Sequence, residues 1–306
     1  MSSIPGKVRI AFLGALVVAG LLVPAGSASA QTLNGLWAPL TRCPVDAPPL
    51  LATNGVDSDP LCIAATSPDG EIKLGNTTST TGATNLQIAG VADDGVVAPL
   101  IQPAGGALVS EPVNVPGGLL GLMCPSDIPL VSALCATITD SELNRVTATV
   151  AMAGEPSGFS TTAGLFQGRP IVTLPVKVNL DHPLLDPNCS IGSEAQPIIL
   201  QPSNTVRPTA ASARADLNGT PNPQGVLTRI STAATQGDNT FAVPGAQNCG
   251  LFGLIDQAIN LQQGLPSPSG NNYLVLNSAQ SFIMTSGVTP VTGQQFSDGW
   301  HSAVLP

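Results

Sequence analysis

Two segments near the middle of the chain alternate apolar and polar residues with a period of two. In residues 169–180 the apolar positions are Leu174, Val176, Val178 and Leu180. Residues 145–152 follow the same rule, and their apolar positions are Val146, Ala148, Val150 and Met152. This period predicts two β-strands, each with one buried and one wet face. Pro175 has no N–H for strand pairing, which predicts that the first of these strands lies at a sheet edge or carries a bulge.

Shorter apolar runs between turn residues predict further strands. The predicted strands are 71–74, 85–91, 96–101, 107–115, 197–201, 226–233 and 273–277. Asp93-Asp94-Gly95 has the composition of a hairpin turn between two of them. Three polar or proline-rich stretches are expected to lack regular structure: an irregular loop at 43–62, a turn region at 76–84 and a long exposed loop at 202–225.

Helical spacing occurs in two places. Apolar residues recur three and four positions apart over 128–138 and again over 251–262, where Gly264 and Pro266 end the pattern. The sequence therefore predicts an all-β or β-dominated fold. We expect an antiparallel β-sandwich-like single domain, residues 31–306, with two or three short helices and three disulfides.

The first thirty residues have the features of a secretory signal peptide. A short basic segment precedes an apolar run, Ile10–Val23, and the small residues Ala28-Ser29-Ala30 precede a predicted cleavage before Gln31. The alternative is a membrane anchor, but the run is short for crossing about 30 Å of hydrocarbon. The expected location is secreted, extracellular or loosely attached to the cell surface, with no membrane insertion after signal cleavage.

Six cysteines remain after that cleavage, an even number that predicts three disulfides in an oxidising compartment. Several connectivities are open, and pairing of sequential neighbours is the one we expect. The expected pairs are Cys43–Cys62, Cys124–Cys135 and Cys189–Cys249. A zinc site is the weaker alternative, because no two cysteines have the C-x2-C spacing.

The charge balance narrows the range of partners. The chain carries 10 basic and 19 acidic residues, and loss of Lys7 and Arg9 with the signal peptide leaves a net charge of −11. Nucleic-acid binding requires basic groups to neutralise phosphates, so we expect no nucleic-acid partner. Only 9% of the residues are charged, which leaves the surface to Thr, Ser, Asn and Gln.

Candidate catalytic residues are few. His182, in Asp181-His182-Pro183 after the predicted 169–180 strand, and His301 are the only histidines, and the G-x-S-x-G motif of hydrolases is absent. The five glutamates and the scarcity of aromatic residues disfavour a glycosidase. Aspartates at 57 and 59, 93 and 94, and 181 and 186 offer oxygen ligands for calcium, but none fits the EF-hand loop. We assign no catalytic, cofactor-binding or metal residue, and no cofactor.

Three segments carry a resemblance to a known group of proteins: Gly118–Asp127 (GLLGLMCPSD), Cys189–Ser193 (CSIGS) and Trp300–Val304 (WHSAV). They resemble secreted proteins of actinobacteria, and the similarity covers most of the chain after the signal peptide. That group has no assigned activity. The resemblance therefore implies export and source, and it identifies no catalytic residue.

Three hypotheses for function follow. The first is a non-catalytic structural or binding protein of the extracellular space or cell envelope, whose partners would be envelope components or another extracellular protein. The second is a secreted hydrolase, which requires His182 in a cleft within hydrogen-bond reach of a Ser and an Asp. The third is a carbohydrate-binding module, which requires Trp37, Tyr273 or Trp300 to be exposed on one face. Whether the protein is an enzyme stays open, and the first hypothesis is preferred.

Overall fold

The computed structural model describes residues 32–138 and 142–306. The predicted signal peptide, residues 1–30, lies outside this part of the chain. The described residues form two antiparallel β-sheets, a few short helices and three disulfides, so the β-dominated, sandwich-like fold predicted from the sequence is confirmed. The disulfides join the expected pairs, Cys43–Cys62, Cys124–Cys135 and Cys189–Cys249. None of the described helices is both long and apolar enough to cross a membrane.

The larger sheet contains ten strands within the described residues, in the main order β12-β14-β16-β1-β4-β5. β13 pairs with β14, β2 with β16, β3 with β2, and β6 with β4. The strands are β1 (Asp59–Ser67), β2 (Asp69–Leu74), β3 (Thr77–Thr81), β4 (Thr84–Asp93), β5 (Val96–Ile101), β6 (Leu108–Ser110), β12 (Ser203–Val206), β13 (Thr209–Ala215), β14 (Val226–Asp238) and β16 (Tyr273–Thr285).

The smaller sheet contains six strands within the same residues, in the order β15-β10-β9-β8-β7, with β11 beside β9. Its strands are β7 (Val113–Asn114), β8 (Thr147–Met152), β9 (Leu174–Asp181), β10 (Ser190–Ile191), β11 (Ile198–Leu200) and β15 (Ala246–Gln247). The alternation predicted for β9 is confirmed, because Leu174, Val176, Val178 and Leu180 are all buried and the residues between them are half-buried.

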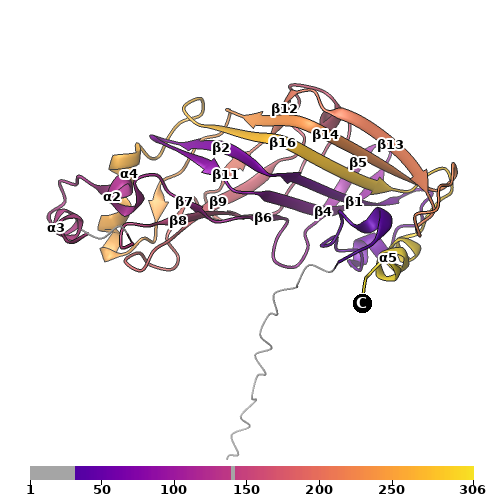
Figure 1. Ribbon diagram of the computed structural model, residues 1–306, viewed down its shortest axis with the longest axis horizontal. Helices are drawn as coiled ribbons and strands as arrows, with labels where there is room; N and C mark the ends of the chain where they lie inside the picture. Colours follow the sequence, from indigo (N-terminus) through magenta and orange to yellow (C-terminus); the bar gives the residue numbers. More distant parts are fainter. Residues whose placement is uncertain (1–31, 139–141) are drawn as a thin grey trace, which may run out of the picture.

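The helices gather at the two ends of an elongated molecule (Figure 1). α2 (Gly118–Met123), α3 (Pro129–Thr137) and α4 (Leu254–Gln263) lie at one end, and α5 (Gly293–Ser302) lies beside the C-terminus at the other. α1 (Pro48–Leu51) and the 3-10 turns η1 (Gly35–Trp37), η2 (Ala163–Leu165) and η3 (Leu251–Gly253) are short. α3 and α4 confirm the two predicted helices. α5, which begins with a capping box formed by Thr292 and Gln295, was not predicted.

The core divides along the larger sheet. On one face, the small sheet packs with α2 and α4 around a large apolar cluster that includes Leu174 and Leu274. On the other face, the N-terminal segment and α5 pack around Trp37 and Phe296, whose rings meet edge to face at 4.9 Å. The larger sheet is therefore buried on both sides near β1, and its small-sheet side holds the cavity described below.

Two predicted features of the strands are wrong. β9 is not an edge strand, since it pairs with β8 on one side and with β10 and β11 on the other. Pro175 is tolerated there because it lies one position beyond the β8–β9 residue pair at the end of the register, Met152–Val176, and its carbonyl accepts a hydrogen bond from the amide of Ala153 (2.8 Å). The segment 107–115 is not one strand, because Pro112 interrupts it. β6 pairs in the large sheet and β7 in the small one.

Three stretches expected to be irregular contain strands. The 202–225 stretch holds β12 and β13, which pair with β14 along an edge of the large sheet and are mostly exposed. The 76–84 turn region holds β3, and the 43–62 loop ends in β1. In β3 and β13, Thr and Ala residues extend a sheet through backbone hydrogen bonds without needing an apolar face.

Candidate ligand-binding cavity

An apolar cavity of about 120 Å³ lies between the two sheets. β2 and β16 of the large sheet form one wall, and β8 and β9 of the small sheet form the other. Leu74, Leu274, Val150 and Val178 point their side chains into it from these walls. Since strands alternate their faces, the same period of two that buries β9 also supplies the apolar lining of this wall.

A second apolar cavity of about 90 Å³ continues from the first toward the middle of the sandwich. Five residues border both spaces, which places the cavities end to end; these are Thr84, Leu108, Leu174, Pro202 and Leu276. Voids larger than a water molecule are few in protein interiors, and an apolar cavity of about 150 Å³ is known to stay dry and to bind benzene. Two such spaces in line provide room for a small elongated apolar molecule.

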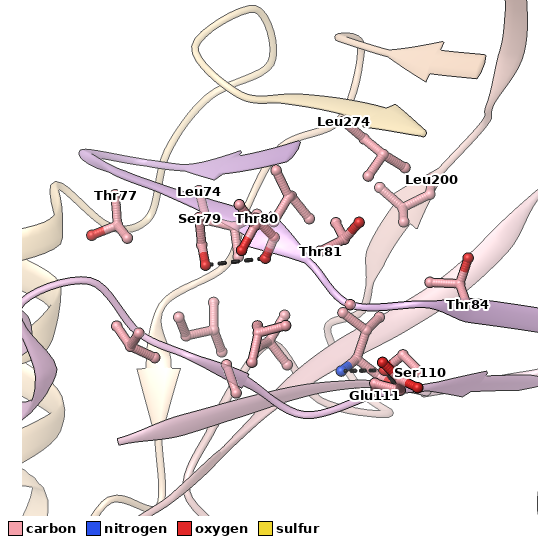
Figure 2. A pocket seen from close by; sticks show the side chains of 18 of the residues that line it. Leu74, Thr77, Ser79, Thr80, Thr81, Thr84, Ser110, Glu111, Leu200 and Leu274 are labelled. Atoms are coloured by element: carbon pink, nitrogen blue, oxygen red, sulfur yellow. Dashed lines mark hydrogen bonds between the residues drawn. The ribbon is translucent and has the colours of Figure 1, made fainter. Parts of the chain in front are cut away.

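One side of the first cavity carries hydroxyl groups. Figure 2 shows Thr77, Ser79, Thr80 and Thr81 of β3 along this side, with Ser110 and Glu111 on the chain opposite. Thr80 and Glu111 are exposed to solvent and also line the cavity, so the cavity reaches the surface between β3 and the crossing at residues 111–112. We call this opening the rim.

The rim is held by backbone contacts between the segment after β3 and the segment after β6, both belonging to the large sheet. The amide of Glu111 donates to the carbonyl of Ala83 (2.9 Å), directly after β3. Gly82 packs so closely against Glu111 that a Cβ atom at position 82 would lie 2.8 Å from the Cβ of Glu111. A side chain at Gly82 would therefore push β3 away from the crossing, so glycine is required by this close approach.

The end of the cavity nearest the helices is closed by Gln263, a buried residue of α4. Its side-chain amide donates to the carbonyls of Gly121 (2.8 Å) and Leu122 (3.0 Å) at the end of α2. Its side-chain oxygen accepts a hydrogen bond from the hydroxyl of Thr77. Gln263 thus ties α2, α4 and β3 together, and all of its polar atoms are satisfied.

Thr81 differs from its neighbours because its hydroxyl oxygen is buried and makes no hydrogen bond within the protein. Among the described residues, only one other buried side-chain atom, a guanidinium nitrogen of Arg214, also lacks a hydrogen-bond partner. Buried hydroxyls normally find a partner, and an unpaired one costs about 1–3 kcal/mol. Because almost none of its surface is accessible even to water, this unpaired hydroxyl lowers the stability of the fold and is not a contact point for a ligand.

Neither histidine forms a catalytic arrangement. His182 is buried, its Nε2 donates to the carbonyl of Leu143 (2.8 Å), and its Nδ1 accepts from the amide of Leu184 (3.0 Å). Both ring nitrogens are therefore used by the backbone, and neither is bonded to a Ser or an Asp. The requirement stated for a hydrolase at His182 is not met.

His301 does approach a serine and an aspartate, but in the wrong order. Its Nε2 lies 2.9 Å from a carboxylate oxygen of Asp46, and the hydroxyl of Ser297 donates to the same oxygen (2.6 Å). A catalytic histidine must sit between the serine and the acid, whereas here the acid sits between them. Ser297 is only 2% exposed. The cluster fastens α5 to the segment before α1.

The pKa of Asp46 is lowered from its usual value of 3.8, chiefly by the hydrogen bond from Ser297. Partial burial acts in the opposite direction, and His301 adds to the lowering through its hydrogen bond and charge. Burial lowers the pKa of Arg42, whose guanidinium donates to the carbonyls of Asn85, Gly106 and Ala107. Both groups fasten segments together away from the cavity.

The aromatic residues do not form an exposed sugar-binding platform. Trp37 and Trp300 are buried, and their indole N–H groups donate to the carbonyls of Leu217 (3.0 Å) and Leu40 (2.8 Å). Tyr273 is half-buried and donates to Glu71 on the neighbouring strand β2. In residues 32–138 and 142–306, no three His, Cys, Asp or Glu side chains come together to hold a metal ion.

The rim and the cavity could not be found from the sequence as such. The residues of β3, all Thr and Ser, favour a turn when only composition is considered, and the apolar residues of 107–115 predict a single strand. The signals were the β-branched run Thr77-Thr78 with Thr80-Thr81, which favours a strand, and Pro112, which breaks one.

The fold and site together define a two-sheet β-sandwich protein with an apolar cavity that reaches the surface through a hydroxyl-lined rim. Comparison of this chain with protein-family models and with curated proteins, and of its fold with solved structures, found no match.

Proposed function

We propose that this is a secreted, non-catalytic binding protein that holds a small apolar molecule, or the tail of a larger one, between its two sheets. The observation that carries the proposal is the pair of apolar cavities in line, with a rim open to solvent. Ligand sites in proteins are typically concave and mostly apolar with a few placed polar groups, and the cavity has this composition.

Export is part of the proposal. The signal-peptide features and the resemblance to secreted actinobacterial proteins support it, and three disulfides are typical of an oxidising compartment. The extracellular medium or the cell surface is therefore where the ligand would be met. An envelope component with an apolar part is the partner that fits both the location and the cavity.

The absence of a catalytic arrangement around either histidine supports binding over hydrolysis. His182 is committed to the backbone, and Ser297 has no base to activate it. Within the described residues, the lining of the first cavity contains aliphatic side chains, hydroxyls, one amide and one carboxylate, and the second cavity adds the ring of Phe159 and the amide of Gln236. These groups can hold a molecule in place, and they do not form a nucleophile with its base.

The test is a titration of the mature, disulfide-bonded protein with linear alkanols from hexanol to decanol by calorimetry. Burial of each CH₂ group contributes about 0.8 kcal/mol, so affinity should rise about fourfold per carbon until the cavities are full and then level off. Non-saturable binding, or affinity that rises without a limit, would refute a cavity of fixed size.

A matched pair of variants locates the binding. Ala148 of β8 lines the cavity, while Ala151 of the same strand is on the other face. Ala148→Leu should fill the space and abolish alkanol binding, whereas Ala151→Leu should leave it unchanged. Equal binding by both variants would show that the alkanols bind elsewhere.

A further inference from the structure

The charged groups around the cavity restrict the ligand's head group. Among the described residues that line the first cavity, Glu111 is the only charged one, and the second cavity is lined by none. Glu111 is exposed at the rim and makes no ion pair with any described residue. A fatty acid or phosphate ester entering tail first would place its negative charge beside this carboxylate, with no basic group to neutralise it.

The polar groups available to a head group are hydroxyls. Ser79 is half-buried and Thr80 is exposed, and both residues line the cavity. The hydroxyl of Ser79 donates only to a backbone carbonyl, that of Thr80 (3.2 Å), and its lone pairs are free to accept. A hydroxyl group both donates and accepts, so it suits a partner that does the same, such as an alcohol or a sugar hydroxyl.

We propose that the cavity selects uncharged, hydroxyl-bearing amphiphiles, with the apolar tail between the sheets and the hydroxyl head at the β3 side of the rim. This rests on the proposed function and adds the class of ligand. Ser79 is the residue that we assign to the head group, and Glu111 is the residue that excludes anions.

A cationic head group fits less well, because the rim offers a single carboxylate that is already solvated. Attraction to Glu111 would favour an ammonium group by about the fivefold that repulsion costs an anion, but removing the ammonium charge from water to reach the hydroxyls of β3 costs more than this exposed pair returns. A neutral hydroxyl loses less water on entry and can hydrogen-bond to the hydroxyls of Ser79 and Thr80.

The test compares three probes with the same tail at pH 8: octanol, octanoate and octylamine, titrated into the mature protein by calorimetry. We expect octanol to bind most tightly and octanoate to bind about tenfold more weakly or worse. A charge separated from Glu111 by about 4 Å in water accounts for roughly fivefold of this difference, and the cost of removing the carboxylate from water adds to it.

Variants at two cavity-lining positions, with one control, test which residues cause these differences in affinity. Glu111→Gln should narrow the gap between octanol and octanoate by about fivefold, whereas Glu155→Gln, at an exposed position away from the cavity, has the same net charge and should leave the gap unchanged. Ser79→Ala should weaken octanol binding about fivefold, the worth of one hydrogen bond, while binding of toluene, which has no polar group, should persist.

The possible results distinguish a failure of the head-group assignment from a failure of the proposed binding function. Octanoate binding as tightly as octanol would overturn the head-group assignment and leave an apolar binding protein. Octylamine binding tenfold more tightly than octanol, with the advantage lost in Glu111→Gln, would overturn it in favour of cationic ligands. Failure of all three probes and of toluene to bind would instead refute the proposed function itself.

Discussion

Ser110 and Val150 hydrogen-bond to each other in both directions: the Ser110 hydroxyl donates to the Val150 carbonyl (2.9 Å) and accepts from the Val150 amide (3.1 Å). Ser110 belongs to β6 of the large sheet and Val150 to β8 of the small one, and both line the cavity. A single side chain thus takes the place of a strand partner and joins the two sheets beside the rim.

We predict that Ser110→Ala lowers the free energy of unfolding by about 2 kcal/mol, because it leaves a backbone donor and an acceptor of Val150 without partners. Urea denaturation measures this. Ser79→Ala is the control, since that hydroxyl bonds only to the carbonyl of the next residue, and its loss should cost about 0.5 kcal/mol or less. Similar losses in the two variants would contradict the bridging role of Ser110.

In contrast to Ser110→Ala, Thr81→Val should raise the free energy of unfolding by about 1 kcal/mol. The substitution keeps the shape of the side chain and removes a buried hydroxyl that has no partner. Thr228→Val is the control, because Thr228 is also a strand residue, is buried, and its hydroxyl donates to the carbonyl of Ala213 (3.1 Å). Thermal denaturation should therefore show one variant stabilised and the other destabilised. Destabilisation of both would mean that Thr81 has a partner within the protein.

The lowered pKa of Asp46 predicts a pH dependence. A carboxyl group whose pKa is lower in the folded protein than in the unfolded chain stabilises the fold above its usual pKa of 3.8, and that stabilisation is lost as the pH falls through the lowered value. The difference in unfolding free energy between the wild type and Asp46→Asn should therefore shrink as the pH is lowered from about 5 toward 2.

Ser297→Ala provides the second arm of this pH experiment, because Ser297 is the chief cause of the lowered pKa. With that donor removed, the pKa of Asp46 should move back toward its usual value. The variant should therefore lose less stability than the wild type as the pH falls. A constant offset between wild type and Asp46→Asn over the whole range would rule out linkage at this site.

We expect that replacing Phe252 removes a large apolar side chain without lowering the free energy of unfolding. Its side chain is fully exposed, and its backbone has φ of 56°, a left-handed conformation that disfavours side chains with a Cβ. Phe252→Gly should therefore leave the unfolding free energy unchanged or raise it by about 1 kcal/mol. Phe241→Ala, in the buried core, should lower it by about 3–5 kcal/mol. A loss above about 1 kcal/mol in Phe252→Gly would show that Phe252 packs against the protein.

The sequence predicted the strands and helices that have one solvent-exposed face and one buried face. β9 alternates because only one side of it contacts the core, and the hairpin at Asp94-Gly95 was recognisable because both turn residues adopt positive φ, which that turn type requires. The cysteine pairs were predicted because each closes a local excursion.

Features that depend on distant contacts could not be predicted. β1 was missed because it is buried on both faces, so that Leu61 and Ile63 face one apolar cluster while Cys62 and Ala64 face another, and no alternation remains. The polar strand β3 gains its place only by pairing with β2. The cavity likewise exists only where two sheets from different parts of the chain meet.

The most direct test of the central claim is a crystal structure of the mature protein grown with 8-bromo-octanol, in which anomalous scattering locates the bromine at the tail end. We predict a bromine peak between the sheets, in the space bordered by Val150, Leu274 and Leu276, with the hydroxyl directed toward Ser79. A bromine found only on the outer surface, or an unoccupied interior at saturating ligand, would contradict the claim that the sandwich holds an apolar ligand.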